Sequence, residues 1–118
     1  MRLSMKRLEY YIKDMVKFLK PKIPSGFDML ITGSHEGEAM IQIFKKGTAK
    51  FDGDWDLSTN TIFVSNDIKD YGHLHIFYSA TDPYSSPDYE KKIIPTKDIN
   101  KTGYEVLEAI KQRLHLLQ

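Results

Sequence analysis

Residues 27–45 read FDMLITGSHEGEAMIQIFK and contain two strand-like runs on either side of a polar turn with two glycines. The first run, Phe27–Thr32, is mostly apolar. The second covers 38–45, and its alternate residues on one face are Ala39, Ile41 and Ile43. The turn between them, at 33–37, is too short for a parallel crossover, so we predict that the two strands pair antiparallel.

A helix is predicted on each side of the strand region. In 3–20 the apolar residues recur every three or four positions, at Met5, Leu8, Ile12, Met15 and Leu19. Pro21 and Pro24 end this pattern, since proline cannot continue a helix. The second helix is predicted to begin at Thr102, because Thr102 and Glu105 have the spacing of a capping box. Its apolar positions are Leu107, Ile110, Leu114 and Leu117.

The middle of the chain continues the strand pattern. Residues 49–57 alternate strictly, with Phe51, Trp55 and Leu57 on one face and Asp52, Asp54 and Asp56 on the other, which predicts one half-buried strand. Further strands are predicted at 61–65 and 73–79, with a short addition at 92–94.

This order of elements predicts an α+β fold, helix, about five strands, helix. Because each helix has a single apolar stripe, we expect a two-layer sandwich with both helices packed on one face of an antiparallel sheet. No linker or repeat interrupts the 118 residues, so one globular domain should cover 1–118.

Composition excludes several kinds of function. The chain has no cysteine, so it can form no disulfide, thiolate zinc site or iron–sulfur cluster. Phosphate-binding loops and the G-x-S-x-G nucleophile elbow are absent, so we expect neither a cofactor nor an enzyme. No run of 18 apolar residues is present and charges interrupt the N-terminal apolar stretch, so we expect a cytoplasmic protein with no membrane partner.

Metal and catalytic sites have only partial signals. Asp52, Asp54 and Asp56 begin like a calcium loop, but positions six and twelve are Leu57 and Phe63 instead of glycine and glutamate. His73 and His75 share a strand face and could bind zinc with a third ligand such as His35. Ser34 and His35 are adjacent and lack a third group that would orient them for nucleophilic catalysis.

Two features predict a protein-binding surface. Asp52, Asp54 and Asp56 would form an acidic strand face that steers a basic partner. The loop at 81–89 carries Tyr84 and Tyr89, and tyrosine is a frequent anchor in interfaces. The leading hypothesis is therefore a small non-catalytic domain that binds another protein, as an inhibitor, immunity protein, adaptor or assembly factor.

An alternative is nucleic-acid binding through the first helix. Residues 1–22 carry seven basic and two acidic residues, whereas 23–100 carry a local charge of −5. The basic residues that could follow a phosphate backbone are Arg2, Lys6, Lys13, Lys17 and Lys20. A metal-dependent enzyme using His73 and His75 is the third hypothesis. The apolar helix stripes would also suit a homodimer.

Overall fold

The computed structural model describes residues 5–32, 39–47, 51–52, 55–56, 60–67, 70–79 and 90–117. The described helices are α1 (Met5–Leu19) and α2 (Ile99–Lys111), followed by the short 3-10 helix η1 (Leu114–Leu116). The described strands are β1 (Phe27–Thr32), β2 (Ala39–Lys45), β3 (Phe51–Asp52), β4 (Trp55–Asp56), β5 (Thr61–Asp67), β6 (Asp70–Ser79) and β7 (Lys91–Ile93). Within these ranges, no helix has both the length and the apolarity needed to cross a bilayer.

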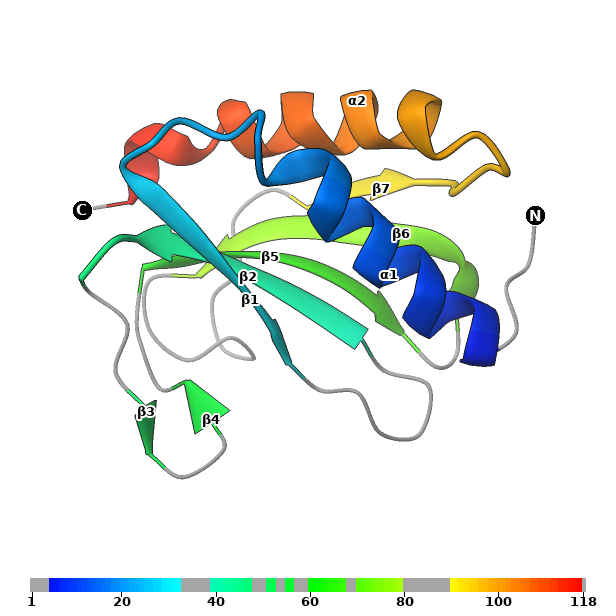
Figure 1. Ribbon diagram of the computed structural model, residues 1–118, viewed down its shortest axis with the longest axis horizontal. Helices are drawn as coiled ribbons and strands as arrows, with labels where there is room; N and C mark the ends of the chain where they lie inside the picture. The colour runs from blue at the N-terminus through cyan, green and yellow to red at the C-terminus, as the bar shows by residue number, and fades with distance from the viewer. Residues whose placement is uncertain are drawn as a thin grey trace.

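One antiparallel sheet of five strands, in the order β1-β2-β5-β6-β7, forms one layer of the fold. Both helices lie on the same face of this sheet (Figure 1), with α1 against β2 and α2 against β6 and β7. The predicted α+β class, with its helix, five strands and helix, is therefore confirmed. β1 and β7 form the two edges of the sheet.

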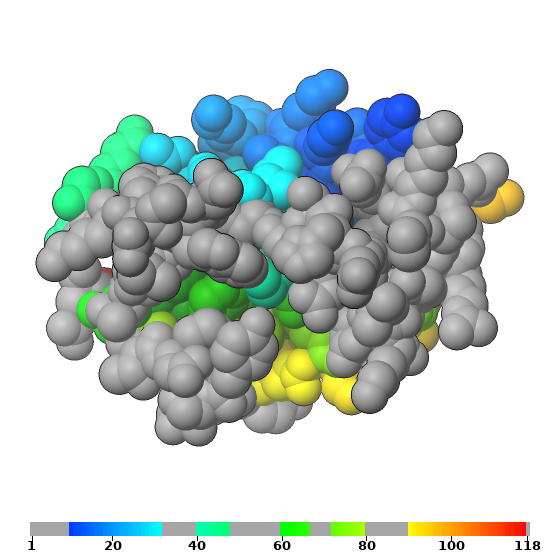
Figure 2. Space-filling view, turned by 90° about the horizontal axis from the view of Figure 1, so that it is seen from below, coloured from blue at the N-terminus to red at the C-terminus, as the bar shows by residue number. Residues whose placement is uncertain are grey.

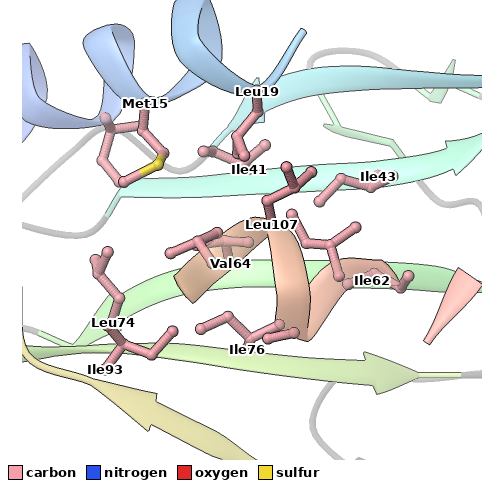
Figure 3. Packing of buried hydrophobic residues seen from close by; sticks show 14 of the residues in the cluster. Met15, Leu19, Ile41, Ile43, Ile62, Val64, Leu74, Ile76, Ile93 and Leu107 are labelled. Carbon is pink, nitrogen blue, oxygen red and sulfur yellow. The ribbon is translucent and has the colours of Figure 1, made fainter. Parts of the chain in front are cut away.

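Branched aliphatic side chains fill the space between the sheet and the helices. Each central strand contributes alternate residues, and the register aligns Ile41, Val64 and Ile76 in one row across β2, β5 and β6. These residues are fully buried, as are Met15 and Leu19 of α1 (Figure 3). Fully burying a side chain of this size contributes about 1.5–3 kcal/mol, so this layer is the main source of stability.

The two helices contact each other at Gly103 of α2. A Cβ atom at Gly103 would lie 2.5 Å from two ring carbons of Phe18, so the Phe18 ring occupies the space a side chain would need. The same ring contacts Tyr104 edge-on, with centroids 5.1 Å apart. On the α1 side, Lys22 Nζ lies 3.9 Å from the Phe18 ring centroid.

The single strand predicted at 49–57 is wrong. β3 and β4 instead form a separate antiparallel pair, in which Phe51 is opposite Asp56 and Asp52 is opposite Trp55. The sequence pattern does not distinguish the two structures, because alternation is equally compatible with one continuous strand and with two antiparallel strands. The fifth strand of the main sheet is β7, which the sequence indicated only as a short addition at 92–94.

The predicted cap at Thr102 is also wrong, because α2 begins one turn earlier. Asp98 is the N-cap, and its Oδ1 accepts hydrogen bonds from the amides of Asn100 (3.0 Å) and Lys101 (3.4 Å). Thr102 is buried inside the helix, and its hydroxyl accepts a hydrogen bond of 2.9 Å from the amide of Thr96. An aspartate at the N-cap accepts hydrogen bonds from the free backbone amides of the first helical turn, so α2 does not need a capping box at Thr102.

Replacing Gly103 with alanine should test the helix contact. Alanine favours helix by about 1 kcal/mol over glycine, whereas overpacking costs about 1–3 kcal/mol. We expect Gly103→Ala to lower the free energy of unfolding by about 1 kcal/mol in urea denaturation, because Phe18 must move. Phe18→Leu in the same chain should recover part of this loss. Glu105→Ala, an exposed site of α2, is the control, and an equal loss there would contradict the explanation.

Tyr11 should make stability depend on alkaline pH. Burial raises the pKa of the Tyr11 phenol, and the charge of Asp98 adds to this shift. Interactions with the Thr102 side chain and the Thr96 backbone oppose it, although neither has the geometry of a full hydrogen bond. Because the pKa is higher in the folded state, the neutral Tyr11 phenol contributes to the free energy of unfolding. This contribution is complete below the pKa of tyrosine in the unfolded chain, about 10, and it is lost as the pH rises through the folded-state pKa.

We therefore expect Tyr11→Phe to reduce the loss of unfolding free energy between pH 9 and pH 11, measured by urea denaturation. Tyr10→Phe is the matched control, since Tyr10 is the exposed neighbour on the same helix. If both variants keep the pH dependence of the wild type, burial of Tyr11 does not explain it.

Candidate functional site

β1 is an edge strand that pairs only with β2 among the described residues. It forms the edge of the sheet nearest the viewer in Figure 1, beside α1. An edge strand presents backbone amides and carbonyls that can pair with another chain. This edge is therefore the first candidate for a binding site.

The hydrogen bonds of β1 show which of its amides face outward. The amide of Phe27 donates to Pro24 O (3.2 Å), and the amide of Met29 donates to Asp28 Oδ1 (2.8 Å), so neither belongs to the ladder with β2. Amides of alternate residues in an antiparallel strand point to the same edge. The amide of Ile31 and the carbonyls of Phe27, Met29 and Ile31 therefore lie on the outer edge.

The side chains of β1 leave this edge partly apolar. Ile31 is 38% exposed, and Met29 and Leu30 are half-buried. Natural edge strands are commonly protected by lysine, proline or a bulge. β1 contains neither lysine nor proline, and Asp28 is its only charged residue. Among the described residues, two outward amides of this edge already have internal partners, Phe27 with Pro24 O and Met29 with Asp28 Oδ1, which leaves the amide of Ile31 for pairing.

A small pocket of about 160 Å³ lies beside the start of β1. Three consecutive strand residues, Phe27, Asp28 and Met29, line it together with Lys20 and Lys46. Consecutive strand residues point to opposite faces, so a pocket that touches all three opens beside the strand and not over one face of the sheet. Figure 2 shows α1 and β1, in blue and cyan, along the upper margin of the face opposite the helices.

The exposed face of α1 agrees in part with the predicted basic surface. Lys13, Lys17 and Lys20 are exposed, so all three are accessible to a partner. Lys6 lies in α1, where only its backbone is described, and Arg2 lies outside the described residues. Three of the five predicted basic residues are thus accessible, two of them on α1 and Lys20 directly after it.

The residues predicted to bind a protein partner are described only in part. Asp52 and Asp56 lie in β3 and β4, for which the structure gives backbone pairing alone. Because these are two strands, the continuous strand that would have aligned the aspartates does not exist. Asp54, Tyr84 and Tyr89 lie outside the described residues, as do Ser34 and His35. The roles of these residues remain predictions.

His73 and His75 do share one face of β6, and their ring centroids are 6.5 Å apart. His75 Nδ1 contacts Glu90 Oε1 just before β7, so the imidazole holds a carboxylate of the neighbouring segment. No group of three or more His, Asp or Glu side chains in the described part of the chain could hold a metal ion. The contact with Glu90 is accordingly interpreted as a link between β6 and the residue before β7.

Sequence reasoning missed the edge position of β1 and the pocket beside it. The run Phe27–Thr32 was identified as a strand, but strand order decides which strand is an edge, and strand order has no local signal. The pocket brings residues of 20–29 together with Lys46, which is far from them in sequence. The lack of lysine and proline in Phe27–Thr32 is the one signal that becomes informative once the order is known.

Removing the Glu90 carboxylate should test the link between β6 and β7. Because Glu90 is 39% exposed on its side chain, we expect Glu90→Ala to lower the free energy of unfolding by about 1 kcal/mol or less. Glu108→Ala is the control, an exposed glutamate on α2. Equal losses in urea denaturation would show that the contact with His75 contributes nothing specific.

No protein-family model, curated protein or solved structure matches this chain. Its function is therefore inferred from its own residues, beginning with the open edge of β1.

Proposed function

We propose that this chain is a small non-catalytic domain that binds another protein through the outer edge of β1. The observation that carries the proposal is the set of outward backbone groups on this strand, next to partly exposed apolar side chains. An extended segment that adds to a sheet edge gains affinity from main-chain hydrogen bonds and specificity from side-chain pockets. β1 has both, since the pocket lies beside it.

Ile31 is the most informative residue of this edge. Its amide faces outward, so pairing with a partner strand would use it, whereas the ladder with β2 does not. Its side chain is also 38% exposed, although it lies opposite Ile41 in the register. A binding strand would cover this exposed apolar surface and satisfy the amide at the same time.

The acidic and aromatic residues named from the sequence remain part of the proposal. Asp52, Asp54 and Asp56 are proposed to contribute long-range attraction to a basic region of the partner. Tyr84 and Tyr89 are proposed as further contacts. The roles open to such a domain are inhibitor, immunity protein, adaptor and assembly factor. We propose a cytoplasmic location, which the lack of cysteine supports because reducing compartments do not maintain disulfides.

Nucleic-acid binding is the second candidate, and one observation favours it. Lys13 and Lys17 are exposed on α1, and Lys20, exposed directly after the helix, continues their row at spacings of four and three residues. Such a row could contact phosphates, with affinity that falls steeply as salt increases. Asp14 is exposed on the same helix and weakens this field, so the protein-binding proposal is preferred.

Replacing Ile31 with proline should distinguish backbone pairing at the β1 edge from contacts made by the Ile31 side chain. Ile31→Pro removes the outward amide, and proline is tolerated where a strand amide faces solvent. Ile31→Ala is the matched control, because it removes most of the side chain and keeps the amide. In capture from nuclease-treated native lysate, we expect one stoichiometric protein partner to bind the wild type and Ile31→Ala and to be lost with Ile31→Pro.

Both variants should be shown to fold by circular dichroism before capture. A partner that is retained by folded Ile31→Pro would contradict binding at the β1 edge. Recovery of nucleic acid alone from untreated lysate, lost when Lys13, Lys17 and Lys20 are replaced by glutamine, would instead support the second candidate.

A further inference from the structure

We propose that the β1 edge selects an extended acidic segment of its partner, with one apolar side chain of that segment in the pocket beside Phe27. This inference rests on the proposed protein-binding function and specifies the chemistry of the partner. It is carried by the size of the pocket, its apolar lining, the lysines beside it and the contact that Asp28 makes with the backbone.

The size of the pocket fits one side chain. Pockets for small molecules and cofactors usually have volumes of about 300–1,000 Å³. The pocket beside β1 has about 160 Å³, and it opens next to a strand edge that can hold a peptide backbone. A single side chain from an added strand therefore matches this site better than a free ligand does.

The lining of the pocket favours an apolar side chain. Ile23, Phe27 and Met29 line it, and all three are half-buried residues that pack against the core. Their remaining exposed surface is apolar, so an aliphatic side chain that covers it gains from the removal of water. Leucine, isoleucine and methionine have suitable sizes and shapes.

The charges around the pocket favour acidic neighbours for that side chain. Lys20 and Lys46 line the pocket, and both are exposed. Lys22 is occupied elsewhere, since its Nζ donates to Phe18 O. Among the described residues that line the pocket, Asp28 is the only acidic one. The excess of positive charge should attract carboxylates and exclude basic segments.

Asp28 also affects the β1 edge itself, because its carboxylate accepts a hydrogen bond from the outward amide of Met29. A partner strand must displace this bond to complete its ladder, and the Asp28 charge repels an acidic segment. Asp28→Asn removes the charge and keeps an acceptor, whereas Asp28→Ala removes both. Binding should therefore tighten in Asp28→Asn and more in Asp28→Ala, by about three- to tenfold for the latter.

A randomised heptapeptide library displayed on phage tests the inference directly. We expect selection on the wild type to enrich peptides with an aliphatic residue flanked by at least two Asp or Glu, and selection on Ile31→Pro to enrich none of them. The dissociation constant of the best peptide is then measured by fluorescence anisotropy. We expect Lys20→Gln with Lys46→Gln to weaken it about five- to tenfold.

Lys13→Gln is the matched control, because Lys13 is exposed on the same helix and does not line the pocket. If Lys13→Gln raised the dissociation constant of the peptide as much, the lysines would act by general electrostatic attraction and not at the pocket, and the inference would be overturned. Enrichment of neutral or basic peptides that still require the Ile31 amide would also overturn it, and would leave protein binding at the edge intact. If the lysate partner survives Ile31→Pro, the proposed function fails as well.

A second copy of the chain is the other occupant that the experiment can reveal. Sedimentation of the wild type should show a monomer at micromolar concentration. A dimer that Ile31→Pro abolishes would place a second β1 on the edge and overturn the acidic-peptide inference.

Discussion

A single periodicity of two residues connects the core of this protein to its surface chemistry. In β1 the side chains of Met29 and Ile31 align with Ile43 and Ile41 of β2, on the side that faces the helices. The same alternation turns the amides of these β1 residues away from β2. A slip of one residue would therefore expose the core side chains and reverse the outward amides together. Burial of the aliphatic layer therefore decides which backbone hydrogen-bonding groups of β1 point outward from the sheet.

The elements whose signal is local were predictable from the sequence. The first helix follows from apolar residues three and four positions apart, and prolines end it, as the structure of α1 shows. Phe27–Thr32 was identified with its observed boundaries. The two-layer arrangement followed because each helix had one apolar face to bury.

The errors occurred where one local pattern allows two structures. Strict alternation around Trp55 fits a straight strand and a hairpin equally well, and backbone pairing decides between them. Thr102 and Glu105 have the spacing of a cap, but Asp98 satisfies the first amides of α2 one turn earlier. The candidate site was beyond sequence reasoning for a different reason. An edge is a property of strand order, and the pocket adds Lys46, which only folding brings beside residues 20–29.

The glycine at the helix contact extends this dependence across the molecule. Gly103 lets the Phe18 ring approach α2 and so determines how closely α1 packs against α2. Lys20, which lines the pocket, follows Phe18 by two residues. The Lys20 side of the pocket is therefore positioned from the opposite half of the helical layer. Under the proposed function, sequence changes in α2 would alter partner choice from a distance. Related chains that differ only at this helix crossing would then differ in specificity while β1 itself stays the same.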